Sequence, residues 1–278
     1  MTPSILFACL TLLFAPKASA ESPQLPAVEP VEIRVGTYNI WGLPGLLTKP
    51  RWRHRRGLVN RFLGLGDFDV LAGQEVFDNA IDDLEPGPDL TTSTGDAGLG
   101  FWFGPKVRLY SQDFTRHFRT RRGVERLKRK GVIGAELSLE GGARVWVYDT
   151  HLQAYAFEGA AEARADQVAE IIEAVDARPG PAILLGDFNL HRGFEPDDVI
   201  AGALLAAGFR DVAAELGNTG EGTWSDTDLR LDRIYLRDGS DGCLTPTDYQ
   251  VQKQALEPGV VVSDHHPVWA RVRVEGCG

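Results

Sequence analysis

The stretch at residues 182–190, with the sequence AILLGDFNL, constrains the fold of this chain most strongly. Four apolar residues precede Gly186, and an uninterrupted apolar run of this length predicts a strand that is buried on both faces. Ligands of α/β proteins bind beyond the carboxyl ends of such strands, so we expect Asp187 and Asn189 to face a ligand. Asp and Asn are also common turn residues, so this stretch alone leaves both interpretations open.

Several other predicted strands also end in polar side chains. Apolar runs or alternating patterns predict strands at residues 33–42, 69–77, 101–103, 131–139, 144–149, 229–236 and 268–274, of which 229–236 should be half-buried. Helical spacing predicts one helix that continues from the segment 45–56, a second at 158–176 and a third at 199–207. Residues 87–98 are predicted to form a loop. The polar residues at or beside the strand ends are Asn39, Glu75, His151, Asp187, Asn189, Asp232, Asp264 and His265. Each could be an ordinary structural residue, but together they predict one shared pocket.

The ends of the chain differ in composition from the rest. Residues 1–20 hold an apolar run followed by Ala18-Ser19-Ala20, which predicts a cleaved signal peptide and therefore a secreted or periplasmic protein. Residues 21–31 read as a proline-containing linker, and residues 32–278 as one domain. Without Cys9, an exported chain keeps only Cys243 and Cys277, for which we expect a disulfide.

Charge is unevenly distributed along the chain. The net charge of −10 argues against a general polyanion-binding protein, because such binding needs many Lys and Arg contacts. The segment 116–130 is nevertheless strongly basic, and either is a solvated face or attracts phosphates or an anionic surface. The basic residues at 49–56 are interpreted as a solvated helix start or as a rim that attracts an anionic substrate.

The residue types at the strand ends suit one kind of chemistry. Carboxylate and amide oxygens without cysteine favour Mg²⁺ or Mn²⁺ over Zn²⁺. Histidine is the general acid or base that works near neutral pH, and a neighbouring Asp can orient it. The chain lacks a Gly-x-Ser-x-Gly elbow, a His-Glu-x-x-His motif and a phosphate-binding loop. These observations predict metal-assisted transfer of a phosphoryl group to water.

The order of these motifs resembles the endonuclease/exonuclease/phosphatase superfamily. The segments that carry the resemblance are Tyr38-Asn39-Ile40-Trp41-Gly42, Gln74-Glu75-Val76, Thr150-His151-Leu152-Gln153, Gly186-Asp187-Phe188-Asn189, Leu231-Asp232-Arg233-Ile234 and Ser263-Asp264-His265-His266-Pro267. The resemblance covers about residues 32 to 274 and implies an α/β fold, a four-layer αββα sandwich of two packed mixed sheets flanked by helices. It also implies Mg²⁺-dependent phosphoester cleavage by one in-line attack of water.

The resemblance also implies a role for each residue. Glu75 would be the principal metal ligand, with Asn39 supporting the metal and the phosphate and Asp264 holding the metal site from beside His265. His265 would be the general base, oriented by Asp232. The remaining roles would fall to Asp187 and Asn189, which would position the nucleophile and phosphorus, and to His151, which would stabilise charge on the phosphate or assist the leaving group.

Within the superfamily, residues 150–154, 74–77 and 130–132 look most like neutral sphingomyelinases. Residues 123–127 lack the Asp that usually precedes the Lys-Gly pair of those enzymes, and an apolar membrane-inserting hairpin is not evident unless Phe101-Trp102-Phe103 forms it. The expected partner is a phosphoester substrate, a phospholipid at a membrane surface, with no protein partner implied and a monomeric chain. One alternative is a secreted deoxyribonuclease-like enzyme, because residues 231–234 resemble the corresponding stretch of such enzymes. Two others are an inositol-phosphate or other phosphatase and a binding protein that has lost the chemistry.

Overall fold

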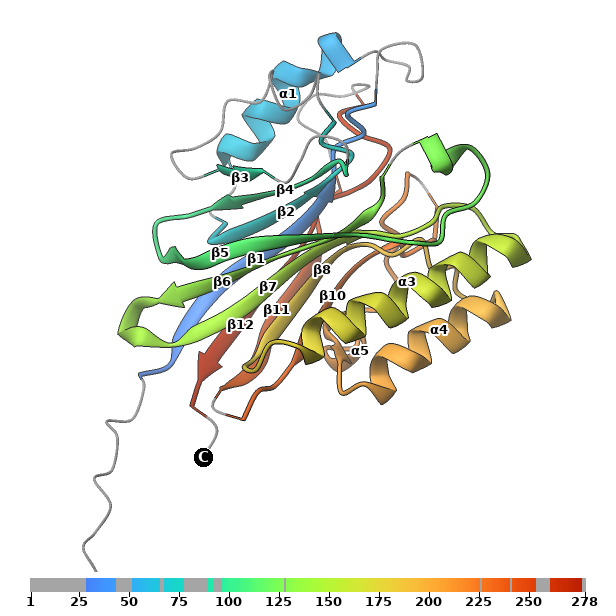
Figure 1. Cartoon of the computed structure of the whole chain (residues 1–278). Coiled ribbons are helices and arrows are strands. Elements are labelled where there is room, and N and C mark those ends of the chain that lie inside the picture. The colour runs from blue at the N-terminus through green and yellow to red at the C-terminus, as the bar shows by residue number, and fades with distance from the viewer. Residues whose placement is uncertain are drawn as a thin grey trace, which may run out of the picture.

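The computed structural model describes residues 29–43, 52–65, 68–77, 90–92, 97–127, 129–225, 227–240, 242–253 and 261–276. The predicted signal peptide, most of the linker and Cys277 lie outside these ranges, so the export and disulfide predictions stay predictions. The described residues form two six-stranded sheets packed face to face, with helices on their outer faces (Figure 1). This is the predicted αββα sandwich.

The first sheet has the order β11-β12-β1-β2-β4-β3 and the second has the order β5-β6-β7-β8-β10-β9. In the first sheet, the strands are β1 (Val31–Asn39), β2 (Val70–Gln74), β3 (Leu90–Thr92), β4 (Leu99–Phe103), β11 (Cys243–Val251) and β12 (Val268–Glu275). In the second, they are β5 (Val107–His117), β6 (Gly131–Leu139), β7 (Arg144–His151), β8 (Ala182–Asp187), β9 (Arg210–Asp211) and β10 (Asp232–Arg237). The pairs β1–β2 and β7–β8 are parallel and their other neighbours antiparallel, so both sheets are mixed.

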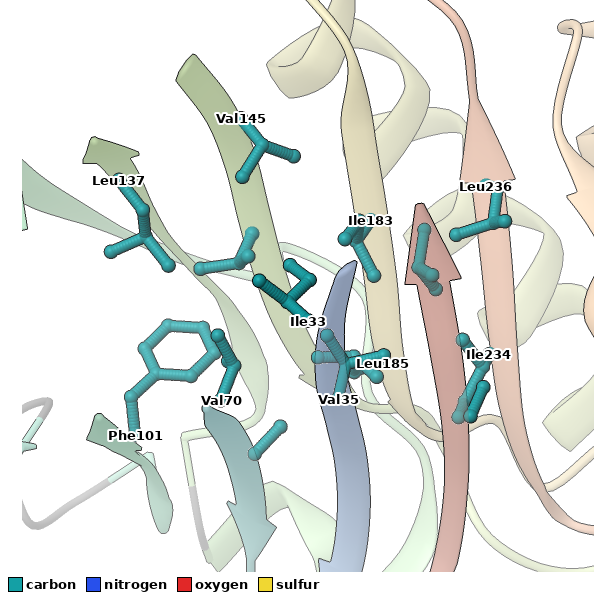
Figure 2. Close-up of a cluster of buried hydrophobic side chains, with 14 of the residues drawn as sticks. Ile33, Val35, Val70, Phe101, Leu137, Val145, Ile183, Leu185, Ile234 and Leu236 are labelled. Atoms are coloured by element: carbon teal, nitrogen blue, oxygen red, sulfur yellow. The ribbon is translucent and has the colours of Figure 1, made fainter. Parts of the chain in front are cut away.

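The main core fills the space between the sheets. Figure 2 shows side chains from the two sheets pointing toward one another, among them Ile33 and Val35 of β1 and Ile183 and Leu185 of β8. Alternate residues of each strand face this layer, which is why the strands read as apolar or alternating in the sequence. Burial of this layer holds the sheets together and brings their strand ends to the same edge of the sandwich.

Helices cover the two outer faces. α3 (Glu158–Asp176) and α4 (Glu195–Ala206) pack on the second sheet through a separate apolar cluster that includes Val168 and Leu204 (Figure 1). α1 (Trp52–Leu65) packs on the first sheet through residues such as Trp52 and Val59. The remaining short elements are α5 (Val212–Glu215) and the 3₁₀ turns η1 (Gly123–Leu127) and η2 (Glu140–Gly142). None of the helices in the described ranges is long and apolar enough to cross a membrane.

Some local predictions need correction. The strand predicted as half-buried, β10, is buried on both faces from Asp232 to Leu236 because other elements cover it on both sides. The predicted loop at 87–98 contains the short strand β3. Helix α4, predicted to begin at residue 199, begins four residues earlier, at Glu195. The strand predicted at 101–103 is confirmed as part of the core strand β4, in which Phe101 is fully buried, and the alternative of an exposed hairpin is wrong.

Candidate active site

The eight predicted site residues lie together at one edge of the sandwich. β1, β2, β7 and β8 end there, and the antiparallel strand β10 begins there. In register, Asp187 lies opposite His151 on one side and opposite Asp232 on the other. Gly186 permits this close packing, because a Cβ at this position would lie 2.1 Å from the carbonyl oxygen of Thr150. Strand ends therefore bring together residues that are far apart in sequence.

Asp187 is the centre of the site. Its Oδ2 atom accepts a hydrogen bond from Asn39 Nδ2 at 3.1 Å and lies 3.4 Å from His151 Nε2 and 3.7 Å from His265 Nε2. Its Oδ1 atom accepts a hydrogen bond from the backbone N–H of Asn189 at 3.1 Å. Burial raises the pKa of Asp187, but the charges of His265, His151 and Lys130 outweigh burial. The pKa of this carboxyl therefore lies below its usual value.

His265 and Asp232 form a buried pair. Asp232 Oδ2 lies 2.8 Å from His265 Nδ1 and also accepts a hydrogen bond from Thr223 Oγ1 at 2.6 Å. Burial lowers the pKa of His265, but Asp232, Asp187 and Asp264 outweigh it and raise this pKa to about 10. The pair orients the ring so that Nε2 faces Asp187 and the pocket, as a general base requires.

The second histidine has the opposite electrostatic environment. Burial and the positive charge of Lys130 lower the pKa of His151 to about 3, so its imidazole is neutral. Two histidines that contact one carboxylate are thus held in different protonation states. This arrangement fits one histidine that exchanges protons and another that contacts the phosphate as a neutral group.

Glu75 is the side chain that best fits a metal ligand. Its Oε1 atom accepts a hydrogen bond from Asn39 Nδ2 at 3.3 Å, whereas Oε2 is buried without a hydrogen-bond partner among the described residues. Burial and the charge of Asp264 raise the pKa of Glu75 to about 7. A divalent cation would satisfy the orphaned oxygen and offset this repulsion, so the oxygen donors present fit Mg²⁺ or a similar hard ion.

A second set of possible ligands lies beside it. One atom from each of Asp187, Asp232 and His265 lies within 4.8 Å of the others. Two of these residues already form the short His265–Asp232 hydrogen bond, and Asp187 accepts hydrogen bonds from Asn39 and Asn189. We therefore interpret this set as the reacting groups and keep Glu75, Asn39 and Asp264 as the predicted metal site.

Backbone strain is concentrated at this edge. Five non-glycine residues in the described ranges have positive φ, namely Trp41, Glu75, Tyr155, Asn189 and Ser225. Glu75 and Asn189 are themselves site residues, with φ of 55° and 50°. Such conformations cost roughly 1–3 kcal/mol each and persist where surrounding contacts impose them, as in functional sites.

Several supporting residues were not predicted from the sequence. Thr223 donates to Asp232 and accepts the backbone N–H groups of Leu231 and Asp232, each at 3.0 Å. Ser263 donates from Oγ to the carbonyl oxygen of Asn39 at 2.7 Å. Thr223 carries no pattern that would have identified it, whereas Ser263 lies in the segment 263–267 that carries the family resemblance but receives no role from it.

Arg55 is the clearest departure from its predicted setting. It lies in the basic segment 49–56, yet it is 1% exposed and its guanidinium donates to the carbonyl oxygens of Ile40, Trp41 and Val262. These carbonyls belong to the loops that follow Asn39 and precede Asp264. Arg55 therefore fixes two loops that carry site residues, rather than forming a solvated helix face.

A buried ion pair braces the other side of the site. Arg164 of α3 and Asp197 of α4 are joined at 2.9 and 2.7 Å, and Arg164 also donates to the carbonyl oxygens of Gln153 and Tyr155. Asp197 accepts the backbone N–H of His191 at 2.9 Å. This network connects the helix layer to the loops that follow His151 and Asn189.

Comparisons with known proteins agree with this fold. No curated protein matches the chain. Solved structures with similar folds include D. rerio TDP2 complexed with a single-strand DNA product (19% identity, TM-score 0.71, covering 87% of this chain and 98% of that one). They also include a mannosyl-6-phosphatase of Bacteroides thetaiotaomicron (17% identity, TM-score 0.64, 86% and 99%) and beta toxin of Staphylococcus aureus (19% identity, TM-score 0.61, 86% and 99%). At these identities the likeness establishes the fold.

The family is established by sequence. Residues 36–265 match the model of the endonuclease/exonuclease/phosphatase family, which covers most of the chain and spans all eight site residues. The chain therefore belongs to the endonuclease/exonuclease/phosphatase family, whose members are metal-dependent phosphoesterases.

Proposed function

We propose that this protein is an exported Mg²⁺-dependent phosphodiesterase that cleaves a phospholipid, most closely a sphingomyelinase-like phospholipase C. The observation that carries the lipid substrate is the segment directly after His151. It presents Tyr155 and Phe157 with 57% and 45% of their surface exposed, at the edge where the site lies. Aromatic side chains beside a phosphoester site suit a substrate that is embedded in a membrane interface.

The Lys-Gly pair supports the same proposal. Lys130 is buried, donates from Nζ to the carbonyl oxygen of Leu152 at 2.5 Å, and pairs with Glu125 at 2.8 Å. Glu125 also accepts the backbone N–H of Ala154 at 2.9 Å. An acidic side chain therefore does precede the Lys-Gly pair, as Glu125 in place of the expected Asp, and it holds the segment that follows His151.

The residues of this chain provide a direct route for hydrolysis. A divalent cation held by Glu75, Asn39 and Asp264 would polarise the phosphate and offset its charge. The pKa of about 10 that His265 has without metal would be lowered by a cation bound beside it. In its neutral form, His265, oriented by Asp232, takes a proton from the attacking water. The hydrogen-bonding groups of Asn189 and Asn39 orient the phosphate, and neutral His151 contacts its oxygens, in a preorganised polar pocket.

The test compares two substrates in parallel. The purified mature protein is assayed with Mg²⁺ against sphingomyelin vesicles and supercoiled plasmid, with His265→Ala as the inactive control. Release of phosphocholine with intact plasmid supports the proposal. Nicked plasmid without phosphocholine release contradicts it and supports the nuclease alternative.

A phosphatase of the same family is the other alternative, and inclusion of a soluble sugar phosphate and an inositol phosphate in the assay tests it. Free phosphate released from either compound, with vesicles left intact, would contradict the lipid proposal. Export is tested by the mass of the protein recovered from its native host, which should lack residues 1–20.

A further inference from the structure

A basic pocket lies beside the site and has no role in the chemistry described above. It has a volume of about 230 Å³ and is lined by Arg119, Thr120, Arg121, Arg122 and Arg126. No acidic residue lines it. The residues come from the basic segment 116–130 and from the turn η1, which Figure 1 shows in green at the end of the sandwich where α3 begins.

The pocket wall is held rigidly from behind. The backbone N–H of Arg119 donates to Glu170, the carbonyl oxygen of Thr120 accepts from Gln167, and the N–H of Arg122 donates to Gln153 at 2.7 Å. Gln153, Gln167 and Glu170 are all buried. Three buried side chains thus fix a short turn, so the arginines project from a preorganised backbone.

The charge of the pocket is only partly offset. Arg119 lies 3.9 Å from Glu170 and Arg122 lies 3.6 Å from Glu162. Both ion pairs are long, and the side chains of Arg119 and Arg122 are 79% and 41% exposed. Such pairs contribute little in water. Four guanidinium groups around one small cavity therefore produce a local positive potential in a protein whose net charge is −10.

The pocket is connected to the site by hydrogen bonds. Gln153, which contacts Arg122, lies two residues after His151 in the chain. Glu125 of η1 accepts the N–H of Ala154, so a hydrogen bond joins η1 to the segment that carries Tyr155. A ligand in the pocket is therefore presented on the same edge as the substrate.

The surroundings of the pocket distinguish between two anionic partners. Leu127 is 86% exposed and directly follows Arg126, and the exposed aromatic rings of Tyr155 and Phe157 lie on the connected segment. Apolar side chains next to arginines suit the headgroup region of an anionic membrane. The net charge of −10 argues against a nucleic acid, because such binding rests on many Lys and Arg contacts.

We propose that the Arg119–Arg126 pocket binds the phosphate of an anionic phospholipid that neighbours the substrate, and so docks the enzyme on anionic membranes. The proposal builds on the lipid substrate proposed above. Guanidinium groups bind phosphate oxygens through paired hydrogen bonds, which gives the pocket preference for a headgroup phosphate over diffuse negative charge.

The experiment measures binding rather than turnover. The full mature chain is sedimented, in EDTA, with vesicles of phosphatidylcholine alone or of equimolar phosphatidylcholine and phosphatidylglycerol. The test variant is Arg119→Gln/Arg126→Gln. The matched control is Arg108→Gln/Arg273→Gln, which removes the same charge from exposed positions on β5 and β12.

The wild type and the control should bind the anionic vesicles with affinities that agree within about twofold. The pocket variant should bind roughly thirtyfold more weakly, because each arginine removed should cost about fivefold in affinity. Hydrolysis of soluble bis(p-nitrophenyl) phosphate with Mg²⁺ should be unchanged in the pocket variant, because its arginines are not site residues. Equal loss in both variants, or no binding of the wild type, would overturn the proposal.

Two further arms separate the other ligands. A pocket variant that loses binding to plasmid DNA while keeping its binding to anionic vesicles would overturn the proposal in favour of nucleic acid. Binding of inorganic phosphate by the pocket without vesicle binding would overturn it in favour of a free phosphate site. Absence of sphingomyelin hydrolysis would contradict the proposed function and leave the vesicle result intact.

Discussion

Replacement of Arg164 by Met should destabilise the protein far more than removal of a typical ion pair. Arg164 and Asp197 are 0% and 1% exposed at their side chains, and the guanidinium makes two hydrogen bonds to the carboxylate and two to backbone carbonyls. Met fills similar space but leaves the Asp197 charge buried without its cationic partner. Removal of one partner from such a pair costs about 3–5 kcal/mol.

The pH dependence of this loss gives a second test. Burial raises the pKa of Asp197, but hydrogen bonds from His191 and Arg164 outweigh it, so its pKa in the folded protein is lowered. A lowered pKa stabilises the folded state above the ordinary Asp pKa of about 3.9, and this stabilisation is lost as the pH falls through the folded pKa. The difference between wild type and Arg164→Met should therefore be larger at pH 7 than near pH 3, which lies below the ordinary Asp pKa.

Urea unfolding, followed by circular dichroism at both pH values, measures this free energy difference. The control is Arg237→Gln, which removes an ion pair to Asp176 of similar length, 2.7 Å, whose carboxylate is 59% exposed. That change should cost no more than about 1 kcal/mol. The reasoning would be refuted if both variants lost the same free energy, or if the loss in Arg164→Met did not depend on pH.

Two of three shorter predictions concern the site, and the third concerns Asp149, which contacts Gln74 between the sheets. Glu75→Gln should weaken Mg²⁺ binding, measured by calorimetry, by more than about tenfold, because even outer ligand partners contribute 10- to 100-fold; an unchanged affinity would remove Glu75 from the metal site. In EDTA, NMR titration should show His265 protonated up to about pH 10, and Asp232→Asn should lower that pKa; a wild-type midpoint near 6.5 would contradict the ion pair. Burial raises the pKa of Asp149, which makes the folded state less stable as the pH rises above about 3.9. Asp149→Asn should therefore reduce the fall in stability between about pH 4 and 7 that urea unfolding measures, and parallel slopes in the two proteins would contradict this.

The site could be located from the sequence because its residues follow strands whose burial is easily recognised. Asp187 and Glu75 come immediately after short apolar runs, and parallel strands that end together place such residues at one edge. Their roles could be named only through the family resemblance, since the composition of a strand end does not distinguish a base from a ligand. The fold followed from the same evidence, and the match over residues 36–265 confirms the family.

The supporting contacts could not be predicted because they depend on distant backbone atoms. Arg55 looks like part of a solvated basic run, but it donates to the carbonyl of Val262, which is 207 residues away. The two-sided burial of β10 had the same cause. The alternating pattern of residues 229–236 indicates one buried and one exposed face. Arg233, on the face expected to be exposed, is nevertheless buried, and its guanidinium donates to the carbonyl oxygen of Leu190. Neither local periodicity nor composition records such partners.

Polar contacts between the sheets explain how the site keeps its geometry. Asn39 of the first sheet donates to Asp187 of the second, His265 beside β12 pairs with Asp232 of β10, and Gln74 of β2 donates to Asp149 of β7 at 2.6 Å. The apolar layer between the sheets favours their association but tolerates small sliding movements, because hydrophobic contact has no direction. Buried hydrogen bonds are directional and are expensive to leave unmade, so they select one relative position of the sheets.

Two of these three contacts join residues that also carry the proposed chemistry. A shift of one sheet would therefore break the buried hydrogen bonds and separate His265 from Asp232 at the same time. Relative placement of the sheets and assembly of the site are thus the same event in this fold. The Gln74–Asp149 contact holds the same alignment without touching the reacting groups, which is why Asp149→Asn, a change that preserves shape, should affect the pH dependence of stability while leaving the site assembled.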